Sequence, residues 1–389
     1  MRRAYKYRLR PTAAQHGRLH QCLRSHRQLY NAALEERREA WRMHRVNVSY
    51  GMQSAQLSAV RAGPEDAAQW SFSSQQATLR RLNWAMAAFF RRVKEGGPPG
   101  FPRFKGADRF DSVEWPKDGD GCRWKPEAHR VYLQGIGAVR VHLHRPAEGC
   151  VKTITVKRDG RHWYLILSCD EVPARPLPAT GAGVGVDVGV TTFLATSDGS
   201  FVDNPRHGRR GAVRLARAQA VVAGKQRGSG NRRAARAVVA NRHRKVTNQR
   251  KDFHHKAALE LVRAYDVIVV EDLAVKNMTR SAGGTVAAPG RKVAQKAGLN
   301  HSILDAGWAQ FRSVLSGKAE DAGRTLIAVN PQHTSQRCAA CGHVEAGNRE
   351  GIAFRCRACG HMAHADTNAA INILGAGLAL LATLESSAA

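Results

Sequence analysis

Two Cys-x-x-Cys pairs in the C-terminal part of the chain constrain its fold more than any other feature. Cys338 and Cys341 form the first pair, Cys356 and Cys359 form the second, and fourteen residues separate the pairs. Each pair offers two thiolates from one tight turn, and two such turns complete a tetrahedron around Zn²⁺. A redox-active pair is the alternative, but no βαβ pattern surrounds either motif. Four cysteine ligands leave no open coordination position, so this zinc is expected to fold a small module and not to catalyse.

The charge of the chain predicts a polyanionic partner. Its 389 residues include 61 Lys and Arg against 31 Asp and Glu, a net charge of +30 with neutral His. Such an excess repels itself in a compact fold unless a polyanion neutralises it, and it is too large for an ordinary metabolic enzyme. Nucleic acid is the expected partner, and an anionic membrane is the other candidate. No run approaches eighteen apolar residues and no signal peptide is recognisable, so we expect a soluble protein in the cytoplasm, associated with the nucleoid.

Hydrophobic patterning divides the first half of the chain. Apolar residues at helical spacing predict a helical unit over residues 12–95, which opens with a capping box at RPTAAQ. Five aromatic residues of this unit are expected to pack in its core rather than stack on bases: Trp41, Trp70, Trp84, Phe89 and Phe90. Alternating segments over 131–169 predict a small β unit, a barrel or sandwich completed by residues 2–10. The Pro-rich segment 171–182 is predicted to be a linker.

Segment 206–256 is the most basic part of the chain. It carries sixteen Lys and Arg, and Asp252 is its only acid. A solvated pair of helices would explain the composition, and a track for phosphate groups is the functional interpretation. We favour the track because so few acids are present to pair with the cations.

Three carboxylates stand where an isolated acid would be costly. Asp187 interrupts the apolar strand GVGVDVGV, Glu271 ends the strand VIVVEDL, and Asp366 opens the helix DTNAAINIL. Taken singly, Asp366 could be a helix cap, and Asp187 or Glu271 could end a strand in solvent. Together they suggest a site for hard divalent cations, and two such ions about 3.5–4 Å apart would hydrolyse a phosphodiester. The absence of GxxxxGK[ST] argues against an ATP-driven motor.

These motifs, in this order, resemble the TnpB family, also called OrfB-type transposases. The resemblance is carried by GVDVGV, VIVVEDLAVKNM and HTSQRCAACGHVEAG…FRCRACGHMAHADTNAAINIL, and RPTAAQ, GFPRFKG, HRPAEGCVKTITVKRDGRHWY and DAGWAQFRSVL extend it over nearly the whole chain. Members of this family are compact RNA-guided DNA nucleases of insertion sequences and are similar to type V CRISPR effectors.

The resemblance implies a multidomain α/β fold. Its centre would be a RuvC-like nuclease core of RNase H type, with a zinc ribbon inserted before the last segment of the core. A wedge-like β-barrel and a helical recognition lobe would complete it. The implied boundaries are 1–11 and 110–175 for the barrel, 12–109 for the lobe, 181–334 and 361–378 for the nuclease, 335–360 for the ribbon, which would bind target nucleic acid, and 379–389 for a C-terminal tail.

The resemblance also assigns roles to residues. Asp187, Glu271 and Asp366 fall on the catalytic acids of the family, which would hold two Mg²⁺ ions, and the four cysteines fall on its zinc ligands. One departure is visible: the family often has D-R-D-x-N before NAA, and this chain has His364 in place of the first acid.

The implied function is that of an RNA-guided, Mg²⁺-dependent DNA endonuclease. A guide RNA from the end of the element would select double-stranded target DNA by base pairing, and the protein would recognise only a short adjacent motif. Two alternatives remain at this point: a nuclease-silent RNA-guided repressor, and a plain basic zinc-ribbon protein that binds nucleic acid.

Overall fold

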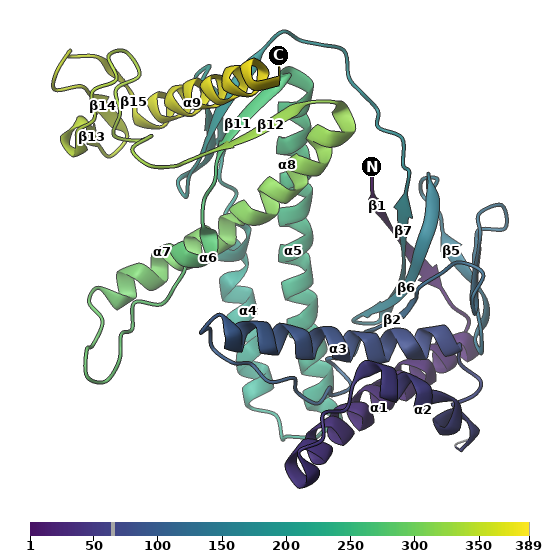
Figure 1. Ribbon diagram of the computed structural model, residues 1–389. Coiled ribbons are helices and arrows are strands. Elements are labelled where there is room, and N and C mark those ends of the chain that lie inside the picture. The colour runs from purple at the N-terminus through teal and green to yellow at the C-terminus, as the bar shows by residue number, and fades with distance from the viewer. Residues whose placement is uncertain (64–66, 389) are drawn as a thin grey trace. The chain divides into compact units, whose positions relative to one another are not determined.

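The computed structural model describes residues 1–63 and 67–388, which form two compact units, Met1–Pro173 and Ala174–Ala389 (Figure 1). Each unit has a hydrophobic core of its own.

The first unit is built on a curled antiparallel sheet. Its strands are β1 (Arg3–Arg10), β2 (Ser112–Trp115), β3 (Cys122–Lys125), β4 (Arg130–Leu133), β5 (Gly137–His142), β6 (Cys150–Asp159) and β7 (His162–Asp170). They lie in the order β2-β6-β7-β1-β5-β4-β3. Alternate residues of β1 are buried, as a strand with one solvated face requires. Within the described residues β2 and β3 each have one partner strand, so these pairings leave the sheet open and do not close it into a barrel.

Three helices complete this unit: α1 (Ala13–His44), α2 (Tyr50–Ala62) and α3 (Phe72–Lys94). The predicted capping box is confirmed, because Thr12 and Gln15 exchange hydrogen bonds at the start of α1. The prediction that the aromatic residues all pack in a core is wrong. Trp70 is buried, but Trp41, Trp84 and Phe90 are more than half exposed, because α3 packs through a face that includes Leu79 and Leu82.

The second unit is built on a mixed five-stranded sheet. Its strands are β8 (Gly183–Val188), β9 (Thr192–Thr196), β10 (Phe201–Asp203), β11 (Val267–Glu271) and β12 (Thr325–Val329), in the order β10-β9-β8-β11-β12. The first three strands form an antiparallel meander. β11 runs parallel to β8 on one side and to β12 on the other, and it is an apolar run as a central parallel strand should be.

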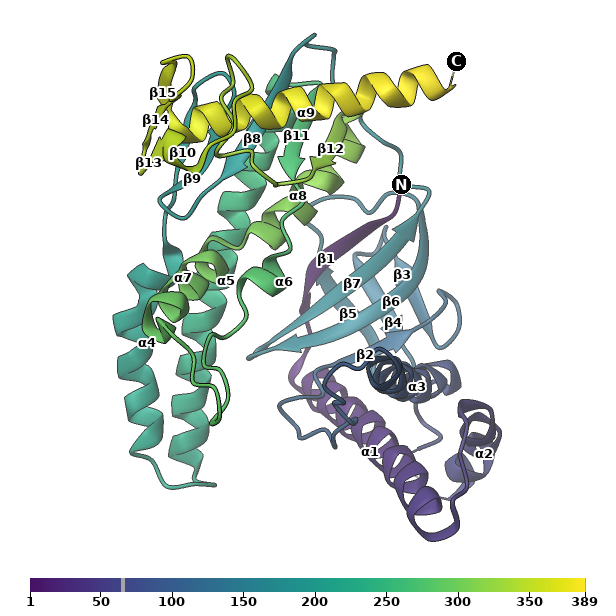
Figure 2. The same cartoon turned by 60° about the vertical axis from the view of Figure 1, so that its left-hand side comes forward.

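Helices complete the second unit. They are α4 (His207–Ala223), α5 (Gly230–Ala264), α6 (Val275–Met278), α7 (Val293–Ala306), α8 (Trp308–Ala322) and α9 (Ala365–Ala388). The helical stretch over residues 293–322 is divided into α7 and α8, because Gly307 adopts a left-handed conformation with φ +73° between them. Figure 2 shows α9 lying across the strands. Its close approach needs Gly185, where a Cβ atom would come within 2.0 Å of the Ala370 carbonyl oxygen.

A small three-stranded sheet precedes α9. Its strands β13 (Arg349–Glu350), β14 (Ala353–Arg355) and β15 (Met362–His364) pair in sequence order, and a short 3₁₀ helix, Ala346–Asn348, precedes β13. The last strand lies beyond residue 360, where the ribbon was expected to end. It runs directly into α9.

One helix of the described chain is long and apolar enough, by length and composition alone, to cross a membrane. It is the segment Ala365–Leu384 of α9. This segment is not an unbroken apolar run in the sequence, because polar residues such as Asn368 and Asn372 interrupt it. Ala369, Ala370 and Ile373 are buried against the sheet, so this half of α9 packs as the core helix of a globular unit.

Candidate functional site

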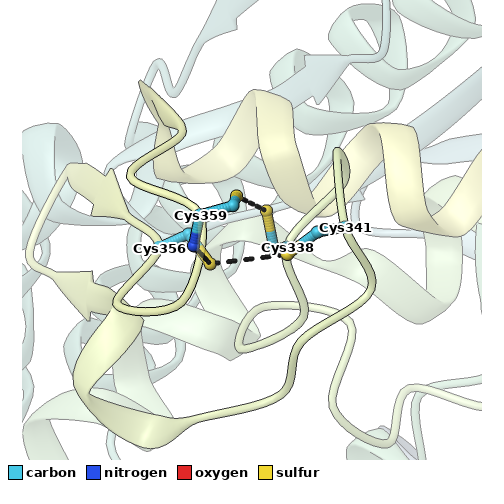
Figure 3. A group of neighbouring side chains, drawn as sticks. All are labelled: Cys338, Cys341, Cys356 and Cys359. Carbon is cyan, nitrogen blue, oxygen red and sulfur yellow. Dashed lines mark hydrogen bonds between the residues drawn. The ribbon is translucent and has the colours of Figure 1, made fainter.

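The four cysteines of the two Cys-x-x-Cys pairs converge on one point (Figure 3). Their four sulfur atoms all lie within 4.8 Å of one another. The Sγ atoms of Cys338 and Cys359 are 3.8 Å apart, and those of Cys341 and Cys356 are 3.6 Å apart. A tetrahedron of thiolates with Zn–S bonds of ~2.3 Å has edges of about 3.8 Å, whereas a disulfide brings two sulfurs to about 2.05 Å. The cluster therefore fits a structural zinc ion.

The backbone of each pair is shaped as a metal-binding turn. Gly342 and Gly360 donate their N–H groups to the carbonyls of Cys338 and Cys356, at 2.9 Å and 3.0 Å. Both glycines have a positive φ, which favours a residue without Cβ. The backbone N–H of Cys359 faces the sulfur of Cys356 and lowers the pKa of that thiol to about 6. At Cys356 this favours the thiolate, the form that binds zinc, whereas hydrogen bonds with the neighbouring cysteine thiols raise the pKa of Cys341 to about 12.

The three acidic residues come from β8, β11 and α9. Asp187 is next to the last residue of β8, Glu271 is the last residue of β11, and Asp366 is the second residue of α9. Val186 pairs with Val270 in the parallel register, so the residues that follow them, Asp187 and Glu271, reach the same edge of the sheet. Because α9 begins at Ala365, Asp366 lies inside its first turn and is not the N-cap residue that the simpler explanation suggested.

These acids share one electrostatic environment. Burial raises the pKa of Asp187 to about 7, and the negative charges of Glu271 and Asp366 add to that effect. Burial also raises the pKa of Glu271. Neighbouring acids that resist ionisation are typical of a site that receives cations. The ligand atoms of the three carboxylates do not all lie within 4.8 Å of one another. Among the described residues, only the four cysteines form a group that is this compact.

Two residues from the cysteine-bearing region bind these acids. Thr334 donates its hydroxyl hydrogen to Oε1 of Glu271 at 2.5 Å. Arg349, on β13, donates from Nη2 to Oδ1 of Asp366 at 2.7 Å. Neither residue could be recognised in the sequence, because each contact joins two segments that are distant in the chain and share no motif.

Amides of α9 hold the same region from the other side. The side chain of Asn368 accepts from the N–H of Ala339 at 3.0 Å and donates to the carbonyl of Arg337 at 2.7 Å. Asn372 donates to the carbonyls of Thr334 and Arg337. The sequence does contain one indication of this role: the i, i+4 spacing of the two asparagines in NAAIN places both amides on one face of the helix.

His364 has a defined structural role. Its Nδ1 accepts the backbone N–H of Asp366 at 3.2 Å, as an N-cap side chain does. Its ring lies edge-on to Phe201 of β10, with the ring centroids 4.7 Å apart. The side chain that replaces the usual acid of the family thus fixes the start of α9.

Basic residues line a cavity of about 450 Å³ between α4 and α5. They include Arg210, Arg214, Arg242, Lys245 and Arg250. The helix pair expected over 206–256 is present, and no residue of α4 is buried. Asp305 of α7 accepts from the backbone N–H groups of Gly208 and Arg209 and pairs with Arg250 at 3.1 Å. This acid attaches the start of α4 to α5 and α7, while most of the cations remain available.

Three family models match the chain. Residues 165–282 match the OrfB_IS605 model, described as "Probable transposase", and residues 308–373 match a "Cas12f1-like, TNB domain". Residues 1–45 match a model described as "Helix-turn-helix domain"; in the structure this segment is strand β1 followed by the single long helix α1. The first two matches cover the sheet of the second unit, the cysteine cluster and the first turns of α9.

Curated relatives match over nearly the whole chain. The chain is 34% identical over 387 residues to "Putative RNA-guided DNA endonuclease InsQ" of Escherichia coli (strain K12), covering 98% of this chain and 94% of the relative. It is 35% identical over 387 residues to "Putative RNA-guided DNA endonuclease" of Streptomyces pristinaespiralis, covering 97% and 90%. Among solved structures, the mini-RNA-guided endonuclease CRISPR-Cas_phi3 matches in fold, with a TM-score of 0.52 and 11% identity over 97% of this chain and 92% of that one.

These relatives and this solved structure are all named as RNA-guided endonucleases, and this is the class of protein that the chain resembles. Within that class, the chain belongs to the TnpB, or OrfB-type, family of transposon-encoded proteins, as its motifs predicted.

Proposed function

We propose that the chain is an RNA-guided, Mg²⁺-dependent DNA endonuclease of an insertion sequence, which cuts target DNA beside a short adjacent motif. The observation that carries the proposal is the shared environment of Asp187, Glu271 and Asp366. Three segments far apart in the sequence bring these acids to one place, where burial raises the pKa of Asp187 and the charges of Glu271 and Asp366 raise it further. A chain with a net charge of +30 that concentrates acids at one point needs cations there, because bare carboxylates would repel the phosphates of a nucleic acid.

The topology of the second unit supports a RuvC-like core. An antiparallel meander of three strands is followed by two strands parallel to the first, and the first strand lies at the centre of the sheet. The family resemblance implies this arrangement, and it brings the ends of β8 and β11 side by side. We assign residues 181–334 and 361–378 to the nuclease core and 335–360 to the zinc ribbon; strand β15, at the start of the last nuclease segment, pairs with β14 of the ribbon.

The mechanism divides the work among the site residues. Asp187, Glu271 and Asp366 would hold the metal, because carboxylate oxygens are the ligands that Mg²⁺ prefers. A divalent metal bound there would supply activation of a water molecule and stabilisation of the leaving oxygen of the phosphodiester. Thr334 orients Glu271 through the hydroxyl hydrogen bond. Arg349 offsets the charge of Asp366 and adds a cation that can contact a phosphate.

The remaining parts would hold the nucleic acids. We assign residues 1–11 and 110–175 to the wedge domain, 12–109 to the recognition lobe and 379–389 to a C-terminal tail. The groove between α4 and α5 supplies phosphate contacts to a guide RNA from the element end or to its heteroduplex with target DNA. Such a protein would work in the cytoplasm, on the nucleoid.

Two measurements on one preparation test the proposal. RNA that co-purifies with the protein is sequenced, and the complex is then mixed with plasmids that do or do not carry the matching target, in Mg²⁺ or in EDTA. We expect one discrete RNA and cleavage only with a matching target and Mg²⁺. Discrete RNA with target binding but no cleavage would favour the repressor. The absence of a discrete RNA would leave the plain zinc-ribbon protein.

A further inference from the structure

Four cations stand side by side across four strands of the first unit. In the antiparallel registers Lys125 of β3 pairs with Arg130 of β4, Arg130 with Arg140 of β5, and Arg140 with Arg10 of β1. All four side chains are exposed. Like charges directly opposite each other destabilise a sheet, and neighbouring strands are only about 4.8 Å apart. A row of four cations is therefore expected to have an anionic partner.

The row ends at a pocket. A cavity of about 290 Å³ lies where β1 ends, α1 begins and the β6–β7 hairpin turns, and Figure 2 shows β1 running directly into α1. Three arginines and two histidines line it: Arg8, Arg10, Arg161, His16 and His162. No carboxylate is among the lining residues that the structure describes. This size is near the lower limit for pockets that bind small molecules, so it admits one small unit.

A hydrogen bond fixes the position of Arg8 at the hairpin side of the pocket, and Arg161 lies close to the same histidine. Arg8 donates from Nη2 to Nδ1 of His162 at 3.0 Å, and the Nε of Arg161 lies 3.5 Å from Nε2 of the same ring. A single imidazole thus stands between two guanidinium groups. Arginine keeps its charge at any physiological pH and presents a planar set of donors that matches a phosphate group.

The opposite wall of the pocket is apolar. It consists of Leu9, Pro11 and Trp163. Trp163 is 2% exposed, and its indole N–H, which is buried, meets no acceptor within the part of the chain that the structure describes. The ring of His16 lies edge-on to this indole, with the ring centroids 6.1 Å apart. These residues close the base of the pocket, and its open side presents the guanidinium groups of Arg8, Arg10 and Arg161 to an anionic ligand.

We propose that this pocket binds the phosphorylated end of a nucleic-acid strand whose backbone continues along the row Arg10–Arg140–Arg130–Lys125. A terminal phosphate monoester carries about −1.5 to −2 charges at pH 7, more than the single charge of an internal diester, which suits a pocket with three guanidinium groups. A free mononucleotide has the same chemistry, but it would leave the row without a partner, and for this reason we assign the pocket to a strand end.

Short oligonucleotides test this assignment without metal or cleavage, so its outcome is independent of the proposed nuclease activity. Affinities of the full-length protein are measured by fluorescence anisotropy for one tetranucleotide sequence with a 5′-phosphate, a 3′-phosphate or hydroxyl ends, as RNA and as DNA, in EDTA. The quantity of interest is the ratio of affinities for phosphorylated and hydroxyl-ended forms. General attraction to a basic protein largely cancels in this ratio.

We expect one phosphorylated end to bind about tenfold or more tightly than the hydroxyl-ended form, the range for one or two charge-assisted hydrogen bonds. Arg161→Gln should reduce this ratio toward 1, and Arg161→Lys should restore it in part. The matched control is Arg2→Gln, because Arg2 is already paired with Asp170 at 2.8 Å, and it should keep the wild-type ratio. A wild-type ratio near 1 for both ends would overturn the proposal, as would equal ratios in Arg161→Gln and Arg2→Gln. Competition by adenosine monophosphate with no preference for phosphorylated tetranucleotides would assign the pocket to a free nucleotide and overturn the strand-end assignment.

Discussion

Arg349 and Asp366 form an ion pair, with Nη2 of the arginine 2.7 Å from Oδ1 of the acid. The arginine lies on β13, the first strand of the small sheet that flanks the second cysteine pair, and the acid lies in the first turn of α9. Both side chains are partly buried. The fold of the zinc-binding module therefore sets the charge around one acid of the candidate nuclease site.

Loss of one cysteine ligand should disturb both the module and the acidic site. Cys338→Ser should release zinc and unfold β13–β15, because in such modules the metal supplies ~10–16 kcal/mol of apparent binding energy that is also folding energy. Zinc content and hydrogen exchange of these strands measure the effect. Cys150→Ser is the control, since Cys150 is an exposed thiol outside the cluster. Full zinc occupancy in Cys338→Ser would contradict the four-cysteine assignment.

Alanine at Asp187, Glu271 or Asp366 should abolish cleavage and leave nucleic-acid binding nearly unchanged. Binding arises from many distributed phosphate contacts, whereas the three acids act as one unit. Each single variant should therefore lose about 10³-fold or more in rate, and a double variant should be hardly worse. Rates at saturating target measure this, with Asp203→Ala of β10 as an exposed control. Near wild-type cleavage by Asp366→Ala would remove that residue from the site.

The raised pKa of Asp187 links the stability of the metal-free protein to pH. The folded-state pKa is about 7 against an ordinary value of 3.8, so the contribution of this group to stability is complete below pH 3.8 and is lost as pH rises toward 7. The loss is about 4 kcal/mol at 1.36 kcal/mol per pKa unit. Asp187→Asn should thus make the EDTA-treated protein more stable at pH 8, although it loses Mg²⁺ binding. Urea unfolding at pH 8 that shows no gain over wild type would mean that Asp187 is solvated.

Acidic pH should destabilise the packing of α1 against α3, because the buried His26 links these two helices. Its Nδ1 bonds to the carbonyl of Cys22 and its Nε2 to the hydroxyl of Ser74, both at 2.8 Å. Burial lowers its pKa from 6.5 to about 4, so its contribution is complete above pH 6.5 and about 3 kcal/mol is lost as pH falls toward 4. Amide exchange in α1 and α3, corrected for intrinsic rates, should show lower protection at pH 5 than at pH 7. His26→Gln should lack this pH dependence.

The groove between α4 and α5 should contribute to the salt dependence of binding. Each phosphate contact contributes about 0.7–0.9 to the slope of log affinity against log salt, so Arg214→Gln should lower the slope by about that amount. Lys256→Gln on the same helix pair is the matched control, because Lys256 is already paired with Asp252 at 2.8 Å. Equal slopes for the two variants would show that the groove makes no phosphate contact.

Sequence periodicity and spacing predicted the parts of this molecule that depend on short segments. The cysteine turns follow from two four-residue motifs, and the positions of Asp187 and Glu271 follow from apolar strands that each contain or end in an acid. Thr334 and Arg349 could not be predicted in this way, because their contacts join residues 63 and 17 positions apart. The break at Gly307 depends on a backbone conformation that periodicity does not encode.

The helices α4 and α5 form a continuous insertion between β10 and β11, and their connection, residues 224–229, is largely exposed. None of the three acids lies in this insertion. Exposed connections of this kind tolerate insertions and deletions, and the register of β8, β11 and β12 does not depend on the length of the connection. The last turns of α5, with Ala258 and Leu261, belong to the core of the second unit, so the part that can change is the far end of the helix pair. Its length and charge can evolve, or be engineered, to accommodate a different nucleic-acid ligand while the strands that carry Asp187 and Glu271 stay in place.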